Sequence, residues 1–457
     1  MLPTIATGNV ASALAGEYEV ANSLRFNRGS SDYLSRTQTS GNRKTFTISF
    51  WLKRSGISES TQLIGTDPDG SVGSNFNILD IKSTDELDFS GNVGGTTFRL
   101  ITNRKFRDVS AWYHIVFAVD TTQATASNRM KIYVNGVQET SFSTETYPSL
   151  NLDTRFNLNT YLLTVGGRSG AYLNGYMAEV CLIDGQQLDP TSFGEFDEDT
   201  GIWKPIDVSG LTFGTNGFYL DFQNSGSLGA DVSGNGNNFT VNNLTSIDQT
   251  TDTCTNNYDT ANPLIANSNI TYAEGNLKTS HTYASQWRWT ASTIGVDTGK
   301  WYAEFKVSAV GSETAIGIMP EDAINGNQNS GNDFVGKFTD SVAYLYNGQI
   351  YKSNSIDNTT STYTTNDIVG VALDLDSNSI QFYKNGSSVG SAVSLTANKN
   401  YFFGCAGYNT AIILWNFGNP PFSITSGNSD GNSKGNFEYA VPSGYFALCT
   451  SNLAEHG

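Results

Sequence analysis

Short runs of alternating apolar and polar residues, separated by turns rich in Gly, Asn and Asp, recur along the chain and constrain its fold more than any other feature. The run 45–52 alternates so that one face carries only Phe, Ile and Leu, which is the two-residue period of a half-buried strand. Two further runs end in Asn135-Gly136 and Asn385-Gly386. Asn-Gly tolerates the positive φ that a type I′ turn requires, so each pair predicts a β-hairpin. The pattern as a whole predicts antiparallel sheets.

The composition supports an all-β chain. There are 22 Tyr and 26 Phe against only 4 Met, and aromatic side chains fit a pleated, half-buried surface. The 46 Gly residues supply the turns that such a chain needs. No segment has helical periodicity beyond one or two turns, and 457 residues suffice for more than one domain.

The strand patterns fall into two stretches around a polar segment that contains Asn262-Pro263, a turn signal. We therefore expect a flexible N-terminal arm over residues 1–20 and a first sandwich over residues 21–245. A linker over residues 246–284 and a second sandwich with a C-terminal tail over residues 285–457 follow. The arm has no basic leader region, so we interpret it as an attachment to another protein and not as a signal peptide.

Charge and apolar content exclude two classes of partner. The formal net charge is −17, and Lys and Arg never cluster beyond adjacent pairs. Nucleic acid and anionic membrane surfaces both require a basic stripe, so neither is expected as a partner. Because no run of 18 apolar residues occurs, we expect no membrane insertion.

The four cysteines form no Cys-x-x-Cys pair, which disfavours structural zinc. Two of them lie inside apolar strand patterns, where a free thiol behaves as a small buried hydrophobe. We expect buried free thiols and no disulfide framework at Cys181, Cys254, Cys405 and Cys449.

Two sets of short motifs resemble known families. The order and spacing of the first set resemble the laminin G-like (LamG-like) jelly-roll branch of the concanavalin A-like fold, and those of the second set resemble a SPRY domain, which is a related sandwich. The first set is Ser23–Phe26, Asp32–Leu34, Phe46–Lys53, Trp112–Val116, Ile132–Gly136 and Gly175–Val180. The second set is Gly299–Phe305, Asp367–Asp374, Phe382–Gly386 and Asn416–Phe422. The resemblance implies two concanavalin A-like antiparallel jelly-roll sandwiches.

This pairing, together with the tail segment Pro442–Leu453, looks like virion proteins of marine tailed bacteriophages. The resemblance implies a tail-fibre or surface-appendage adhesin in the extracellular particle. Its expected partners are other virion proteins and a host-surface glycan or receptor, and we expect a homo-oligomer such as a trimer. A purely structural decoration protein of the virion or capsid, which binds no receptor, is the alternative that the sequence leaves open.

A polysaccharide hydrolase is the alternative of another class, because the concanavalin A-like fold also hosts endo-glucanases with a Glu-x-Asp-x-(x)-Glu set. The nearest string, residues 195–200, lacks the final Glu and lies in an acidic loop. Glycoside hydrolysis needs two carboxylates at a defined separation across a cleft. His114 follows Trp112-Tyr113 in a strand, where a packing role is expected. We therefore expect a protein without catalytic residues and not an enzyme.

A calcium site is suggested by the resemblance, because LamG-like domains often bind calcium at the sandwich rim. Asp231, Asn235 and Asn237 offer oxygen ligands on a Gly-rich loop, with Asn238 and Asp221 near them in sequence. Ordinary turn chemistry explains the same residues. We expect no cofactor, and a calcium ion at this loop is the alternative that the sequence leaves open.

A ligand-binding rim is implied on the second sandwich, where partner-binding loops of SPRY domains are found. Tyr346, Asn347, Gln349 and Tyr351 combine aromatic faces with amides, which is a combination that suits sugar recognition. Trp301, in contrast, alternates with Phe305 along one strand face and is interpreted as core.

Overall fold

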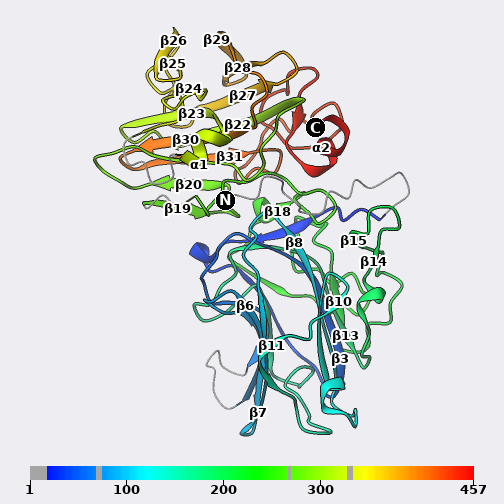
Figure 1. Ribbon diagram of the computed structural model, residues 1–457. Helices are drawn as coiled ribbons and strands as arrows, with labels where there is room; N and C mark the ends of the chain where they lie inside the picture. Colours follow the sequence, from blue (N-terminus) through cyan, green and yellow to red (C-terminus); the bar gives the residue numbers. More distant parts are fainter. Residues whose placement is uncertain (1–17, 68–74, 266–268, 327–332) are drawn as a thin grey trace. The chain divides into compact units, whose positions relative to one another are not determined.

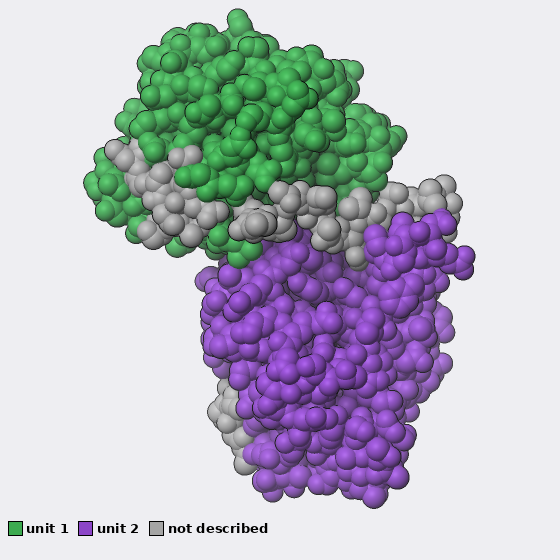
Figure 2. All heavy atoms as spheres, in the orientation of Figure 1, with its two compact units in different colours: residues 1–12, 256–457 green, residues 13–255 purple. Residues whose placement is uncertain are grey.

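The computed structural model describes residues 18–67, 75–265, 269–326 and 333–457. It consists almost entirely of antiparallel sheets in two compact units, which meet in the sequence between Thr255 and Asn256 (Figures 1 and 2). The all-β prediction is confirmed. The predicted attachment through the N-terminal arm concerns mostly residues 1–17, which lie outside the described residues.

The first unit along the sequence, which ends at Thr255 and is labelled unit 2 in Figure 2, is a sandwich of two main sheets with a small third one. One sheet has the order β10-β9-β8-β3-β13-β1-β18, with β16 also paired to β13, and the other has the order β11-β7-β6-β5-β4-β12-β2-β17. The strands of the first sheet are β10 (Val137–Gln138), β9 (Met130–Val134), β8 (Trp112–Asp120), β3 (Thr45–Arg54), β13 (Gly175–Asp184), β1 (Ser23–Phe26), β18 (Gln249–Thr250) and β16 (Phe218–Leu220). Those of the second are β11 (Phe142–Thr146), β7 (Thr96–Lys105), β6 (Glu86–Val93), β5 (Asn75–Ile81), β4 (Thr61–Asp67), β12 (Leu162–Val165), β2 (Tyr33–Thr37) and β17 (Thr240–Asn242). The remaining pair is the hairpin β14 (Gly194–Phe196) and β15 (Trp203–Pro205).

Strand β3 shows how the alternation builds this unit. Its predicted apolar face, from Phe46 to Leu52, lies in the core between the two main sheets. Trp51 points to the opposite face and packs against Trp203 of the β14–β15 hairpin and against Val20. Val20 is 3% exposed, so the end of the predicted N-terminal arm belongs to the first sandwich, because its apolar side chain completes this outer cluster.

The second unit is also a sandwich. One sheet has the order β19-β20-β31-β22-β27-β28-β29, with β32 paired in parallel to β22, and the other has the order β21-β30-β23-β24-β25-β26. The strands of the first sheet are β19 (Ile270–Ala273), β20 (Lys278–His281), β31 (Ala411–Asn416), β22 (Lys300–Ala309), β27 (Ile368–Asp374), β28 (Ser379–Lys384), β29 (Ser387–Ser394) and β32 (Phe446–Ala447). Those of the second are β21 (Arg288–Ala291), β30 (Tyr401–Tyr408), β23 (Glu313–Pro320), β24 (Val342–Leu345), β25 (Gln349–Lys352) and β26 (Ser355–Thr359).

Helical turns are short. The α-helices are α1 (Glu321–Gly326) and α2 (Thr450–His456), and the 3-10 turns are η1 (Arg28–Ser30), η2 (Ala126–Asn128), η3 (Pro190–Ser192) and η4 (Ser246–Asp248). Trp301 and Phe305 are both fully buried in the main core of the second unit, which confirms the prediction for Trp301.

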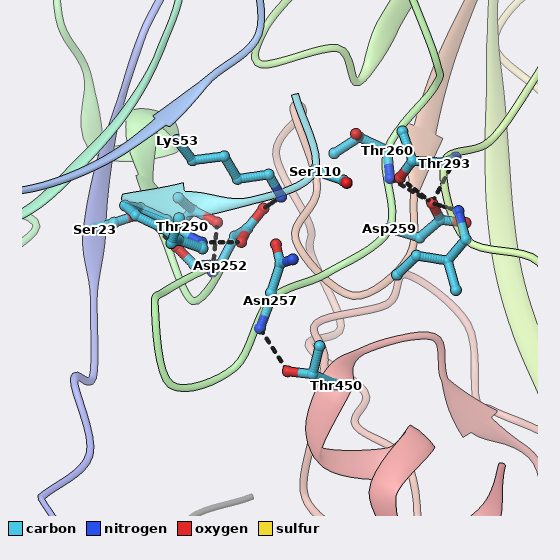
Figure 3. Close-up of polar contacts among 12 residues, drawn as sticks. Ser23, Lys53, Ser110, Thr250, Asp252, Asn257, Asp259, Thr260, Thr293 and Thr450 are labelled. Carbon is cyan, nitrogen blue, oxygen red and sulfur yellow. Dashed lines mark hydrogen bonds and ion pairs between the residues drawn. The ribbon is translucent and has the colours of Figure 1, made fainter. Parts of the chain in front are cut away.

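The predicted linker over residues 246–284 is not an irregular segment. It contains β18, β19 and β20, and each of these strands is paired within a sheet. Asp252 is fixed in the first unit, since its carboxylate pairs with Lys53 at 2.8 Å and its backbone carbonyl accepts a hydrogen bond from Ser23 (Figure 3). In the second unit the buried Asp259 carboxylate accepts four hydrogen bonds from Thr260, Thr293 and Ile294. Polar residues of this segment are therefore buried by pairing, which composition alone does not reveal.

The segment that follows β31 is part of the second sandwich. The amides of Glu438 and Tyr439 donate to the Glu304 carboxylate at 2.9 and 2.8 Å. Tyr258 forms an antiparallel bridge with Cys449, so the two ends of the unit lie side by side. All four cysteines are free and buried, as expected.

Candidate functional site

The predicted rim residues lie on one hairpin but do not form one surface. Asn347 and Gln349 meet at the β24–β25 turn, where the Asn347 amide donates to Gln349 Oε1 at 3.0 Å. Tyr346 packs against the core between the sheets. Tyr351 packs on the outer face of the sheet, edge to face with Phe334 at 5.4 Å. The two tyrosines are partly buried on opposite faces, so they cannot clasp one ligand together.

An open polar hollow of about 250 Å³ lies at the other end of β25. Asp322 of α1, Thr339 and Asp340 of the turn before β24, and Lys399 of the loop before β30 line it together with Ala323. The hollow adjoins the β25–β26 turn, because the Asp340 amide donates to Ser353 Oγ at 2.9 Å. None of the four predicted rim residues lines this hollow.

Lys399 sets the charge balance of the hollow. Its ammonium forms an ion pair with Asp322 and lies 3.9 Å from an Asp340 oxygen. The hydrogen bond from Lys399 to Asp322 raises the pKa of the lysine above its usual value, so the ammonium stays charged. Asp340 is further held by the Thr396 hydroxyl at 2.5 Å. The hollow thus presents fixed carboxylates, an ammonium and a hydroxyl to solvent.

The predicted calcium residues lie in a loop that is held by hydrogen bonds. Both carboxylate oxygens of Asp231 accept backbone amides, including the amide of Asn237 at 2.7 Å. The Asn235 side chain turns its nitrogen towards the carbonyls of Gly214 and Gly217. The oxygen of Asn237 accepts from the Arg36 guanidinium, whose positive charge opposes a calcium ion at this position. Turn hydrogen bonds therefore account for the printed contacts of these residues, and the calcium site remains a prediction.

The acidic string 195–200 forms the exposed turn of the β14–β15 hairpin and not a strand across a cleft. Asp197 accepts the amide and the hydroxyl of Thr200, both at 2.8 Å, and pairs with Lys204 at 3.1 Å. The hydrogen bond from the Thr200 backbone is the main reason that the pKa of Asp197 falls to about 2. A carboxyl with so low a pKa is a poor general acid.

His114 is buried, as predicted, and contacts Ser49 in an arrangement that does not suit catalysis. The indole N–H of Trp203 donates to His114 Nδ1 at 2.9 Å, so the proton of the neutral ring is on Nε2. That proton faces Ser49 Oγ at 2.9 Å, whereas a general base would present a lone pair to the hydroxyl. Burial lowers the pKa of His114 to about 3, which keeps the ring neutral.

His281 has the opposite tautomer. Its Nδ1 donates to the carbonyl of Arg288 at 2.9 Å, so Nε2 can accept a hydrogen bond from Thr279 or from Cys405, whose sulfur is 3.6 Å away. Burial raises the pKa of the Cys405 thiol and lowers that of His281 to about 4, so both groups stay neutral. His281 and Cys405 are fully buried, which removes them from any substrate.

No helix within residues 18–67, 75–265, 269–326 and 333–457 is long and apolar enough to cross a membrane. The same ranges hold no group of three or more His, Cys, Asp or Glu side chains placed to bind a metal ion.

Two family models match one segment of the chain each. Residues 28–187 match the model of the concanavalin A-like lectin/glucanases superfamily, and residues 300–420 match the SPRY domain model. No curated protein sequence matches the chain.

Several solved structures are similar over part of the chain. The SPRY domain of human HERC1 is 17% identical with a TM-score of 0.28, and the match covers 34% of this chain and 96% of that one. The PSpry domain of TRIM65 is 14% identical with a TM-score of 0.29, with coverage of 35% and 91%. A heptameric SAP-like pentraxin from Limulus polyphemus is 12% identical with a TM-score of 0.29, with coverage of 37% and 79%. From the two family matches, the chain combines an N-terminal LamG-like domain of the concanavalin A-like superfamily with a C-terminal SPRY domain.

Proposed function

We propose that this chain is a non-catalytic adhesion subunit of a tailed-bacteriophage particle, and that it recognises host-surface carbohydrate at the hollow beside α1. The phage assignment rests on the resemblance of the domain pairing and of the tail segment to virion proteins. The hollow is the observation that carries the binding proposal.

The chemistry of the hollow suits a ligand rich in hydroxyl groups. Carboxylates accept strong charge-assisted hydrogen bonds from hydroxyls, while the Lys399 ammonium and the Thr339 hydroxyl can donate to ring and hydroxyl oxygens. Among the lining residues that the structure describes, Ala323 alone is apolar, which disfavours an apolar ligand. The volume of about 250 Å³ lies below the roughly 300–1,000 Å³ of typical small-molecule pockets, so a single sugar residue or a chain end fits best.

The absence of catalysis is part of the proposal. The tautomer of His114 prevents it from acting as a general base towards Ser49, because its Nε2–H faces the hydroxyl. Cys405 and His281 are buried in the core, away from solvent. The acidic string that comes nearest to a glucanase motif is an exposed turn. These observations support a binding role over hydrolysis, and incubation with polysaccharides should release no new reducing ends.

The binding proposal is tested by applying the full chain to a glycan array and measuring the affinity of the best ligand by calorimetry. Asp340→Ala should weaken that affinity at least about tenfold, because a charge-assisted acceptor is lost. Asp357→Ala is the matched control, since Asp357 is an exposed carboxylate of β26 outside the hollow. An array without any bound glycan would favour the structural decoration alternative. An unchanged affinity in Asp340→Ala would show that the glycan binds outside the hollow.

A further inference from the structure

The β14–β15 hairpin of the first unit, Gly194–Pro205, displays an aromatic side chain to solvent; we name it the acidic hairpin. Phe196 is 50% exposed although it is a large apolar residue. Val137, which follows the neighbouring Asn135-Gly136 turn, is 55% exposed. Large exposed apolar side chains lose solvent contact favourably on association, and aromatic residues are enriched at the centres of protein interfaces.

The exposed Phe196 side chain is held in place by the residues on which it packs. Its ring packs edge to face on Trp203 with centroids 4.9 Å apart. Trp203 in turn lies against Gly136, where an added Cβ would come within 2.3 Å of the indole. The Trp203 N–H donates to the buried His114, so the hairpin is anchored to β8 by a specific hydrogen bond. A side chain that is already fixed loses little conformational entropy when a partner binds.

The tip of the hairpin is fixed as well. Asp197 accepts hydrogen bonds from the amides of Asp199 and Thr200, which closes the turn. Lys204 lies between Glu195 and Asp197, at 3.6 and 3.1 Å. The pKa of Asp197 is lowered to about 2, chiefly by the hydrogen bond from the Thr200 backbone, so this carboxylate stays charged.

The charge around Phe196 is negative. The acidic hairpin contains the carboxylates of Glu195, Asp197, Glu198 and Asp199 against the single cation of Lys204. Lys204 pairs with Glu195 and Asp197, whereas Glu198 and Asp199 are exposed at the tip. The surface therefore joins one fixed aromatic contact to a rim with an excess of carboxylates over cations.

We propose that the acidic hairpin is a docking surface for a partner protein that presents a short segment in which Lys or Arg side chains alternate with aliphatic ones. The aliphatic side chains would cover Phe196, and the cations would meet the carboxylate rim, which is the complementarity that sets specificity in interfaces. A second copy of this chain fits poorly, because it carries 26 basic residues against 43 acidic ones. This surface lies on the first unit and is independent of the carbohydrate hollow.

The test uses the full chain and three short fluorescent peptides of equal length. One alternates Lys with Leu, the second alternates Lys with Ser, and the third alternates Glu with Leu. Fluorescence anisotropy should show the tightest binding for the Lys–Leu peptide, weaker binding for the Lys–Ser peptide and none for the Glu–Leu peptide. Equal binding of the two Lys peptides would mean that only the net charge of the protein attracts them, and would overturn the proposal.

Matched variants locate the binding. Phe196→Ser should weaken the affinity for the Lys–Leu peptide about tenfold, as expected for an aromatic contact at the centre of an interface. Ile356→Ser is the control, because Ile356 is also 50% exposed but belongs to β26 of the other unit, and it should change nothing. Glu198→Gln combined with Asp199→Asn should weaken binding and reduce its dependence on salt. Binding that is unchanged by Phe196→Ser, in a variant with an unchanged circular dichroism spectrum, would overturn the proposal.

Discussion

The Lys53 ammonium and the Asp252 carboxylate lie 2.8 Å apart, and their side chains are 1% and 0% exposed. The Trp112 indole N–H donates to the other carboxylate oxygen at 3.3 Å. The pair joins β3 to the segment after β18 and therefore fixes the last residues of the first unit onto the sandwich.

Replacing one residue of the Lys53–Asp252 pair should lower the free energy of unfolding far more than replacing both. Asp252→Ala leaves a buried ammonium without its counter-charge, and such changes cost about 3–5 kcal/mol. Lys53→Met combined with Asp252→Leu should recover most of that loss, because two apolar residues need no partner. Urea unfolding followed by Trp fluorescence measures both. A loss below about 1 kcal/mol in Asp252→Ala would contradict the burial of the pair.

Trp301 provides the test of the core of the second unit. The side chain is fully buried, and its N–H donates to the Thr298 carbonyl at 2.8 Å. Trp301→Ala should cost about 3–5 kcal/mol of the free energy of unfolding of this unit, since the cavity cannot be refilled. Ile356→Ala, at an exposed site of the same unit, should stay within about 0.5 kcal/mol. Calorimetry that resolves the two units should show the loss in one transition alone.

Glu304 should make the second unit less stable as the pH rises. Burial raises the pKa of Glu304 from 4.5 to about 7, so the folded state binds its proton more tightly than the unfolded state does. This contribution to stability is fully present below pH 4.5 and is lost as the pH rises through about 7. The loss amounts to about 3 kcal/mol at 1.36 kcal/mol per pH unit.

The variant Glu304→Gln cannot lose a proton, so its stability relative to the unmodified chain should improve steadily over this pH range. Asp197→Asn is the control with the opposite sign, because the pKa of Asp197 is lowered to about 2 and its contribution is lost as the pH falls. Thermal unfolding at a series of pH values measures both, and parallel curves for Glu304→Gln and the unmodified chain would refute the assignment.

The two buried histidines should differ in tautomer. We expect the Nε2–H form for His114, which accepts from Trp203, and the Nδ1–H form for His281, which faces a carbonyl oxygen. Burial lowers their pKa values to about 3 and about 4, so neither ring should titrate between about pH 5 and 8. Long-range proton–nitrogen NMR spectra distinguish the two forms. In Trp203→Phe the His114 spectrum alone should change.

Local patterns predicted the fold well because each strand carries its own signal. The Asn-Gly pairs are both turns with positive φ, at 48° and 77° for Asn135-Gly136 and at 48° and 79° for Asn385-Gly386. In contrast, the segment 246–284 was predicted to be irregular because its Thr, Asn and Asp residues are typical of loops. The partners that bury them are far away in the sequence, as with Ser23 and Asp252.

The candidate site was less predictable, because its residues are also far apart in the sequence. Asp322 of α1, Asp340 of the turn before β24 and Lys399 of the loop before β30 are far apart in the sequence, and nothing in their local sequence distinguishes them from other charged residues. Of the two tyrosines that the sequence favoured, Tyr346 follows β24 and packs against the core, whereas Tyr351 lies in β25 and packs on the outer face of the sheet. The sequence places both residues near one turn but does not show which face of the sheet each side chain covers.

The bridge between Tyr258 and Cys449 has a consequence for synthesis on the ribosome. The first unit is complete once residue 255 has emerged, and domains fold in this order as the chain grows. The second unit has to wait, because the Asp259 amide binds the carbonyl of Leu448 and the Glu304 carboxylate binds amides near residue 438. These contacts of the second unit cannot form until nearly two hundred further residues have been added. Their synthesis takes about 10 s or more. During this interval a finished first unit and an incomplete second unit are present on the same nascent chain.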